Sequence, residues 1–315
     1  MCRFCLALSA AIGFLGVCTL GESAQVTAER SKQGVVIRID GQLFTEYIVR
    51  SGPKPILWPI IGPTGKPMTR AFPMAKGQNE RQDHVHQRSM WFTHGDVNGI
   101  SFWHEQANHG TIVHREFVLV ESGTEARVVT RNDWVGPDGT RHCEDERRLT
   151  FALDGDARRI DFDITLRAPQ DRPVRFGDTK EGTMGLRIAQ SMNVDSRLGG
   201  RIVNSEGQTD AAAWGQRAAW VDYHGPVDGE LVGIAILNHP TSFRFPTYWH
   251  VRTYGLFTAN PFGWRDFQGS KDVDGSYTLP PGKSITLRYR ILFHRGNEKT
   301  ARIADAFVRY AAEAR

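Results

Sequence analysis

The segment from Asp83 to Trp103 carries the side chains best suited to chemistry. It reads DHVHQRSMWFTHGDVNGISFW and interleaves three histidines with several aromatic residues. Imidazoles titrate near neutral pH, so they can transfer protons or bind metals. Flat aromatic faces beside hydrogen-bonding groups are typical of pockets for small polar ligands. The segment is therefore predicted to form the centre of a ligand site.

His84 and His86 are separated by one residue. On a strand, such residues project from the same face, so both imidazoles would enter one pocket. They could act as acid and base, or as hydrogen-bonding groups for sugar hydroxyls. Together with His94 they could instead bind a divalent transition metal, although the first expectation is a site without a cofactor. A third interpretation is a pair of partly exposed loop histidines.

Three further side chains of this segment suit ligand binding. Asp83 could fix the tautomer of a histidine, and Arg88 could hold an anion or a carboxylate. Trp91 could stack on a sugar ring. The alternative for Asp83 and Arg88 is a local ion pair, which contributes little on a protein surface.

A second polar segment, Phe176 to Gly182, reads FGDTKEG. It places Asp178, Lys180 and Glu181 between glycines, just before an apolar stretch. Neighbouring charges can move the pKa of a carboxyl group toward a working value. We expect Glu181 to act as a general base, with Lys180 and Asp178 assisting at the substrate. A purely structural loop is the alternative.

The third polar segment contains YWHVR at residues 248–252, followed by Asn260. Tyr248, Trp249 and the nearby Tyr254 could line a pocket wall into which His250 and Arg252 point. His250 would share proton transfer, while the other residues and Asn260 would bind substrate. As an alternative, strand aromatics of this kind pack in the core.

Alternating apolar and polar residues predict strands over much of the chain. The alternation is clearest at 160–166 and 285–293. An Asp40-Gly41 pair predicts a hairpin between strands at 35–39 and 42–44, and further strands are expected at 111–120, 127–134, 148–153 and 231–237. One helix is expected at 298–314, capped by Asn297 and packed against the outside of a sheet. The predicted fold is all-β, a large antiparallel β-sandwich with one C-terminal helix.

The N-terminus predicts export. Residues 1–24 combine Arg3 with a nearly uncharged apolar run and small residues, which is typical of a secretory signal peptide. Lipid attachment at Cys18 is an alternative that the bulky Val17 disfavours. The remaining residues, 25–315, are expected to form a single domain whose one cysteine, Cys143, allows no internal disulfide. This part has no run of the about 20 apolar residues that a membrane helix needs. The net charge of +4 is modest and scattered, so no nucleic-acid partner is expected.

The chain resembles a secreted bacterial family labelled methane-oxygenase PmoA-like. The resemblance rests on DHxHxR from Asp83, WFxHGDVNGxxFW from Trp91, FGDTKEG from Phe176, and the region from His239 to Gly263. Gln87 departs from the family pattern, which has a histidine there. The resemblance implies a β-sandwich like the supersandwich of galactose mutarotases, in exported proteins of polysaccharide degraders. Methane oxidation is not expected, because the chain lacks a series of membrane spans.

These observations predict an exported carbohydrate-active protein, and first an acid–base enzyme: an epimerase, hydrolase or lyase acting on a sugar or glycoside. Its partner would be a small-molecule or oligosaccharide ligand. Two alternatives stay open. One is a glycan-binding protein without turnover that uses the same cleft, and the other is an enzyme with a metal bound by His84, His86 and His94. All three require that the three polar segments line one hollow.

Overall fold

The Asp40-Gly41 hairpin forms as the sequence predicts. In a computed structural model, which describes Met1 and residues 24–77 and 79–314, strand β2 (Gly34–Ile39) turns directly into β3 (Gln42–Ser51). Asp40 and Gly41 have φ angles of 49° and 76°. Two positive φ angles are what a two-residue hairpin turn requires. Residues 2–23, with most of the predicted signal peptide and Cys18, lie outside the described residues.

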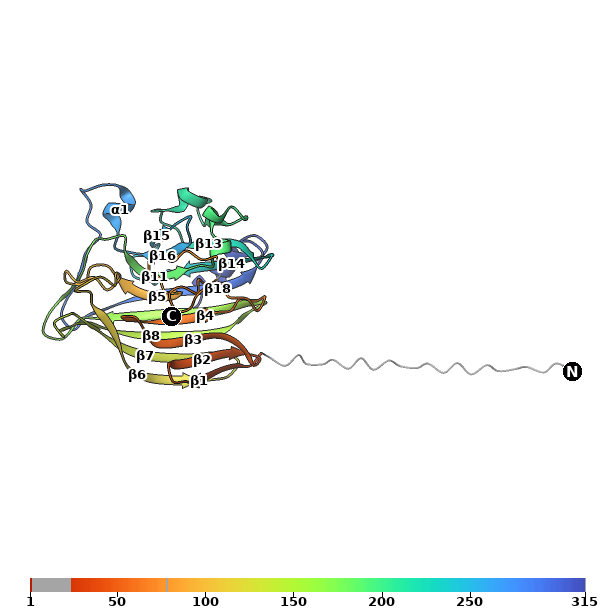
Figure 1. Cartoon of the computed structure of the whole chain (residues 1–315), viewed down its shortest axis with the longest axis horizontal. Coiled ribbons are helices and arrows are strands. Elements are labelled where there is room, and N and C mark those ends of the chain that lie inside the picture. Colours follow the sequence, from red (N-terminus) through yellow and green to blue (C-terminus); the bar gives the residue numbers. More distant parts are fainter. Residues whose placement is uncertain (2–23, 78, 315) are drawn as a thin grey trace.

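Two eight-stranded antiparallel sheets make up most of the fold (Figure 1). The front sheet, as we call it, has the order β1 (Val26–Arg30), β2, β3, β4 (Lys54–Ile60), β5 (Met90–His94), β11 (Gly182–Arg187), β16 (Leu256–Asn260), β15 (Tyr248–Val251). The back sheet has the order β12 (Arg201–Asn204), β13 (Trp220–Val227), β14 (Glu230–Asn238), β18 (Ser284–Arg295), β9 (Ala157–Arg167), β8 (Arg141–Asp154), β7 (Ala126–Val135), β6 (Thr111–Glu121). Every strand predicted from alternation or from the hairpin signal is present, and the antiparallel sandwich is confirmed.

Smaller elements connect the sheets. Strands β10 (Val174–Phe176) and β17 (Tyr277–Leu279) pair with each other. Three short 3-10 helices and one α-helix were not expected from the sequence: η1 (Gln190–Met192), η2 (Val194–Ser196), η3 (Asp210–Ala213) and α1 (Trp264–Gln268). Each is at most about one turn long, too short for the apolar periodicity that predicts a helix.

The main core lies between the sheets, because each strand turns one set of alternate residues inward. On β5, Met90 and Phe92 join the core cluster, while Trp91 faces the other way. On β18, Ile291 and Phe293 point inward, and Leu292 points outward. Each sheet therefore has an outer apolar strip of its own, and the two strips are covered by different segments of the chain.

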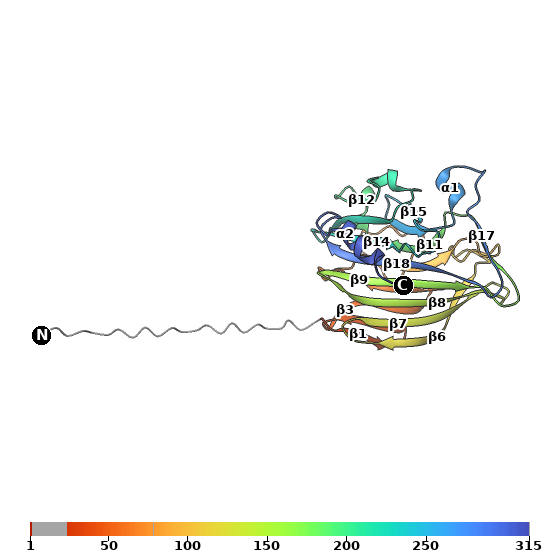
Figure 2. The same cartoon turned by 180° about the vertical axis from the view of Figure 1, so that it is seen from behind.

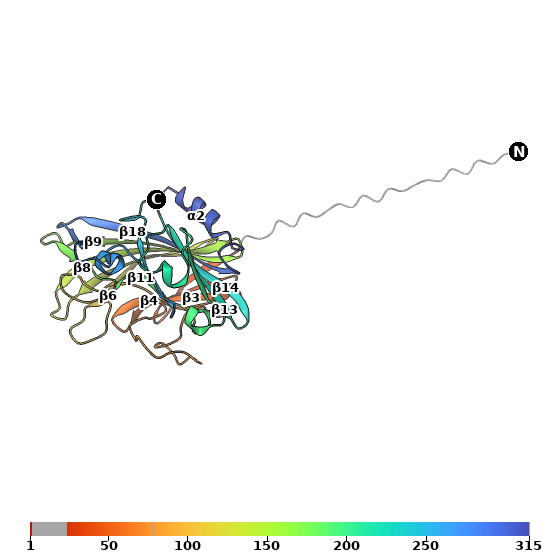
Figure 3. The ribbon, with the colours of Figure 1, turned by 90° about the horizontal axis from the view of Figure 1, so that it is seen from above.

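The outer face of the back sheet carries the C-terminal helix (Figures 2 and 3). Helix α2 (Ile303–Ala311) packs Ile303, Ala306 and Tyr310 on Trp220, Leu237 and Leu292. The helix is shorter than the predicted 298–314. Asn297 caps a preceding turn, in which its Oδ1 accepts from the backbone N–H of Thr300 at 3.0 Å, and Arg302 then has a φ of 53°. This left-handed residue separates the turn from the helix. No helix in the described part is long and apolar enough to cross a membrane.

Candidate functional site

The outer face of the front sheet carries the first polar segment. Trp91 on β5 packs there with Trp103, Ile56 and Leu256. The chain between β4 and β5 crosses this strip and brings His84 and His86 above it. These two histidines lie in a turn rather than on a strand, since His84 has a φ of 45° and its carbonyl accepts from Gln87 at 2.9 Å. The predicted strand geometry is therefore wrong here, but the two rings are still neighbours, with centroids 5.7 Å apart.

Asp83 anchors this turn to the sheet. Its Oδ1 accepts from Arg70 Nη1 at 2.6 Å and from Arg187 Nη2 at 3.1 Å. Burial alone would raise the pKa of Asp83, but Arg187 and Arg70 outweigh it and hold the pKa below its usual value. Arg187, on β11, also donates to Gln87 Oε1 at 2.6 Å. One carboxylate thus serves two buried guanidinium groups.

A second ion cluster lies beside the first. Arg88 forms a bidentate pair with Glu105, at 2.8 and 2.7 Å, and Lys54 Nζ is 3.3 Å from the same carboxylate. Lys54 is completely buried, and burial lowers its pKa to about 8 despite the opposing effect of Glu105. The alternative of a local pair between Asp83 and Arg88 is therefore not what forms: Asp83 pairs with Arg70 and Arg187, and Arg88 pairs with Glu105.

His86 is the more enclosed of the two imidazoles. Its ring lies 5.1 Å from His104 and 6.0 Å from Trp103, centroid to centroid. Burial, followed by the nearby cation of Lys54, lowers the pKa of His86 to about 3. His86 is therefore neutral at pH 7 and can accept a hydrogen bond. His84 is more exposed and lies 3.2 Å from Asp83 Oδ2.

Tyr254 joins the first polar segment to the third. Its ring stacks on His84 at 5.5 Å, nearly parallel, and Arg187 lies over it at 4.6 Å. The guanidinium of Arg252 is 5.9 Å from the same ring and 5.6 Å from the ring of Trp214. Burial raises the pKa of Tyr254, so its hydroxyl keeps its proton at neutral pH.

His250 joins the third segment to the second. Its Nδ1 lies 2.9 Å from the carbonyl oxygen of Lys180, and its ring lies 6.3 Å from Trp214. Burial lowers the pKa of His250 to about 4. Next to Lys180, the carboxylate of Glu181 is close enough to Tyr254 to contribute to the raised pKa of that hydroxyl. Lys180 Nζ is 3.8 Å from Glu181 and 3.6 Å from Asp266.

These contacts form one continuous series from His86 to Glu181 across β5, β11, β16 and β15. A hollow of about 200 Å³ adjoins one end of this series and is lined by Ala211, Trp214, Val251, Arg252 and Thr253. The third polar segment contributes to this lining, whereas the first and second contribute no residue to it. We call this region, from His86 through Tyr254 and Trp214 to Glu181, the front-face site. It brings together side chains from all three polar segments that the sequence indicates.

Several predicted site residues lie apart from the front-face site. His94 and Trp249 belong to the inner face: His94 Nε2 is 2.8 Å from the Gly177 carbonyl oxygen, between the rings of Phe176 and Phe262, and Trp249 Nε1 donates to the Ala218 carbonyl. Trp91 is on the outer face but is 2% exposed beneath Trp103. None of the three side chains is open to a ligand at this surface.

The other three, Asn260, Asp178 and Tyr248, make structural contacts near α1. Asn260 donates to the Thr179 carbonyl at 2.9 Å. Asp178 accepts from the backbone N–H of Gly275 at 2.6 Å and of Arg265 at 3.2 Å. The hydroxyl of Tyr248 is 2.8 Å from Gln268 Nε2. These contacts position the loop that carries Lys180 and Glu181.

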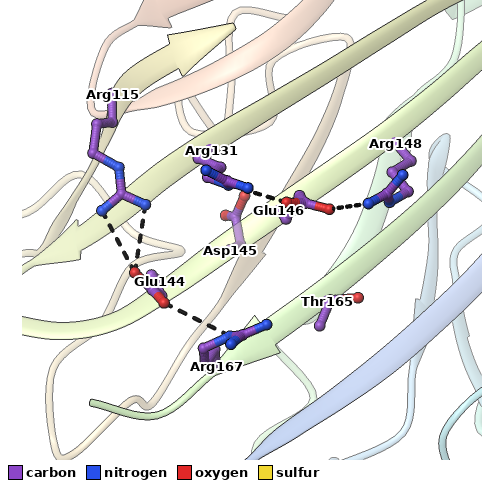
Figure 4. A pocket seen from close by; sticks show the side chains of 8 residues that line it. All are labelled: Arg115, Arg131, Glu144, Asp145, Glu146, Arg148, Thr165 and Arg167. Carbon is purple, nitrogen blue, oxygen red and sulfur yellow. Dashed lines mark hydrogen bonds and ion pairs between the residues drawn. The ribbon is translucent and has the colours of Figure 1, made fainter. Parts of the chain in front are cut away.

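A larger hollow, of about 400 Å³, lies on the outer face of the back sheet, and Figure 4 shows its lining. It contains a ladder of exposed ion pairs along β6, β7, β8 and β9. Arg131 pairs with Glu146 at 3.0 Å, and Glu146 pairs with Arg148 at 2.6 Å. Cross-strand pairs of opposite charge stabilise a solvated sheet face. No histidine or aromatic ring lines this hollow, so it offers little chemistry.

Residues 34–308 match a family described as "Family of unknown function (DUF6807)". The chain belongs to this family. No curated protein matches the chain.

Solved structures with a similar fold include three sugar-active enzymes. The first is the α-galactosidase from Lactobacillus brevis, with 9% identity and a TM-score of 0.39 over 92% of this chain and 43% of that one. The second is a glycoside hydrolase family 97 enzyme from Pseudoalteromonas sp. strain K8 in complex with acarbose, with 11% identity and a TM-score of 0.33 over 86% of this chain and 34% of that one. The third is a GH36 α-galactosidase from Geobacillus stearothermophilus in complex with stachyose, with 10% identity and a TM-score of 0.40 over 86% of this chain and 41% of that one. The DUF6807 chain spans less than half the length of each. Likeness at this level carries no argument about its activity.

Four charged residues of the front-face site in this DUF6807 member were missed by sequence reasoning: Lys54, Arg70, Glu105 and Arg187. Arg187 had a usable signal, because a charged residue in an otherwise apolar strand requires a buried partner. Lys54 and Arg70 are isolated charges outside the motifs, and Glu105 follows the first polar segment by two residues. Only the folded chain shows that these three side chains meet at the site.

Proposed function

We propose that this protein is an exported carbohydrate-active enzyme that carries out acid–base chemistry on a sugar or glycoside at the front-face site. One observation carries the proposal: three segments distant in sequence converge on one sheet face, where imidazoles, a carboxylate and a tyrosine surround aromatic rings. Sugar pockets combine flat aromatic faces with a few placed hydrogen-bonding groups. A pair of groups in opposite protonation states is what general acid–base catalysis requires.

The protonation states suggest the roles. His86, neutral because burial lowers its pKa to about 3, accepts a hydrogen bond from a sugar hydroxyl. Tyr254, protonated because burial raises its pKa, donates a hydrogen bond or a proton from the opposite side of His84. Glu181 is the general base at the far end of the site, and Lys180 stabilises its carboxylate at 3.8 Å. His250 orients this loop through the Lys180 carbonyl.

Charge at the site favours an acidic sugar. Asp83 is shared by Arg70 and Arg187, and Glu105 is shared by Arg88 and Lys54. Those four cations are buried or nearly so and are already paired, whereas Arg252 is exposed and lines the hollow, where its charge is open to a ligand. Arginine pairs well with carboxylates because its planar fork matches their two oxygens. We expect uronic-acid-containing oligosaccharides to bind better than neutral ones.

The first experiment screens the purified protein against neutral and uronic-acid-containing oligosaccharides, by thermal shift and by product analysis. A bound ligand raises the melting temperature by mass action. The substitution Glu181→Gln is expected to lower turnover at least about 100-fold, since a positioned base contributes about 10²–10⁴-fold, while the ligand-induced thermal shift is kept. Glu116→Gln, which removes an exposed carboxylate on β6, is the matched control. Equal turnover in both variants would reject Glu181 as the base.

A glycan-binding protein without turnover would use the same rings and guanidinium groups. It would show the thermal shift with every variant that keeps Tyr254 and Arg252, and it would release no product from any oligosaccharide in the panel. Ligand binding without any product would therefore reject the enzyme and retain the site.

A further inference from the structure

A second polar cluster lies on the outer face of the back sheet, far in sequence from the first polar segment. It consists of Asp222 and His224 on β13, His294 on β18, and Glu298 in the turn before α2. Asp222 and His224 share a face because they are two residues apart on a strand. That face is the one covered by the C-terminal segment, next to Trp220 and Leu292.

The strand register explains how the histidines meet. Gly233 on β14 is the direct partner of both His224 and His294. A Cβ atom at Gly233 would lie 2.2 Å from His294 Cε1. The missing side chain therefore leaves the space in which the His294 ring lies, and this ring reaches Asp222 Oδ2 at 2.6 Å.

The three ligand atoms of this cluster are close enough to share one metal ion. His224 Nδ1 is 2.7 Å from Asp222 Oδ1 and 3.7 Å from Glu298 Oε2, and the three ligand atoms all lie within 4.8 Å of one another. Among the described residues, these three form the group of His, Cys, Asp or Glu side chains whose ligand atoms lie this close together. Imidazole nitrogen with carboxylate oxygens is a donor set suited to Zn²⁺ and related divalent ions.

His294 occupies the place of an outer partner. Its Nε2 contacts the Asp222 oxygen that does not face His224, and its Nδ1 lies 3.1 Å from the Arg295 carbonyl oxygen. Metal-binding carboxylates are generally held in orientation by such hydrogen bonds. Asp222 is fully buried and Glu298 is 13% exposed, so the ion would be enclosed on the sheet side and reached from the Glu298 side.

We propose that Asp222, His224 and Glu298 bind a divalent transition-metal ion, with His294 orienting Asp222. The ion would connect β13 to the turn that precedes α2, so its role is to hold the C-terminal segment on the back sheet. The site is independent of the front-face site and of the function proposed there.

The test is calorimetric titration of EDTA-treated, dialysed full-length protein with ZnCl₂, together with melting temperature. We expect one Zn²⁺ per chain and a higher melting temperature with Zn²⁺. Glu298→Gln, a partly exposed side chain whose loss should leave the fold intact, is expected to weaken Zn²⁺ binding at least tenfold and to abolish the thermal shift. Glu230→Gln, a surface carboxylate on β14 that pairs with Arg295, is the matched control and should bind as the wild type does.

A further variant separates this site from the other histidine cluster. His84→Gln should leave Zn²⁺ binding unchanged, because His84 lies on the front sheet. The proposal is overturned if the wild type binds no Zn²⁺ at a ratio of one, if Glu298→Gln binds as tightly as Glu230→Gln, or if His84→Gln rather than Glu298→Gln removes the ion.

Discussion

At the scale of single residues, burial decides which imidazoles can carry a charge. His86, His94 and His250 are each enclosed by rings and backbone, and burial lowers their pKa values to about 3, 4 and 4. A buried histidine without a carboxylate partner stays neutral. His294 differs, because Asp222 and hydrogen bonds outweigh burial and raise its pKa. The protonation state of each histidine thus follows from its neighbours.

The depressed pKa values predict a loss of stability in mild acid. Below pH 6.5 the unfolded chain protonates these histidines, but the folded protein does not until the pH falls to about 4. Each such group can cost up to about 3 kcal/mol of unfolding free energy over this window. His294 does not offset the loss, because a raised pKa places its own titration above pH 6.5.

Urea unfolding between pH 7 and 4.5 measures this effect. The unfolding free energy of the wild type should decrease steadily as the pH is lowered. For His94→Gln, the plot of unfolding free energy against pH should have a shallower slope, whatever the stability of this variant at pH 7. Parallel slopes for the two proteins would mean that His94 titrates normally in the folded state.

At the scale of elements, the two outer faces are used differently. The front sheet is crossed by loops that bring polar groups over Trp91, whereas the back sheet is sealed by one amphipathic helix at one end. Tyr310 is fully buried under α2, with Arg290 over its ring at 4.5 Å. Val308, on the same helix, is 66% exposed.

This difference predicts unequal effects along one helix. Tyr310→Ala should lower the unfolding free energy by about 3–5 kcal/mol, as for other buried aromatic side chains. Val308→Ala should change it by less than about 0.5 kcal/mol, because exposed positions tolerate substitution. Urea midpoints of the two variants compare them directly, and similar losses would show that α2 is not docked through Tyr310.

At the scale of the whole molecule, the sandwich encloses charge as well as apolar side chains. Asp145 and Arg147 on β8 point into the interior, where Asp145 also accepts from Asn132 at 2.6 Å and from Trp134 at 2.8 Å. The next residue, Glu146, points outward into the ion-pair ladder of Figure 4. Two neighbouring acidic residues on one strand therefore face different environments: Asp145 faces the protein interior and Glu146 faces water.

Removing each acid should reveal this contrast. Asp145→Ala leaves Arg147 buried without its partner, which costs about 3–5 kcal/mol. Glu146→Ala breaks exposed pairs worth less than about 1 kcal/mol. Thermal or urea unfolding of both variants gives the comparison. Equal losses would contradict the interior position of the Asp145–Arg147 pair.

The sequence by itself determined the class of the fold. Period-two alternation at 160–166 and 285–293, and the Asp40-Gly41 turn, depend on neighbours in the chain, so strands and hairpin could be predicted from local pattern. The same local reasoning found the polar segments that contain His84, Glu181 and His250. It placed His84 and His86 on a strand and extended α2 too far, because turn geometry is only weakly encoded locally.

Only the tertiary structure decided which face each side chain occupies and which distant residues it meets. Trp91 and Trp249 look alike in sequence, yet one lies outside the front sheet and the other in the core. Lys54, Glu105 and Arg187 reach the front-face site through sheet pairing and loop crossings over long sequence separations. The cluster of Asp222, His224, His294 and Glu298 likewise exists only because Gly233 lies between two strands. Contacts of this kind depend on the packing of the whole chain, and no local pattern contains them.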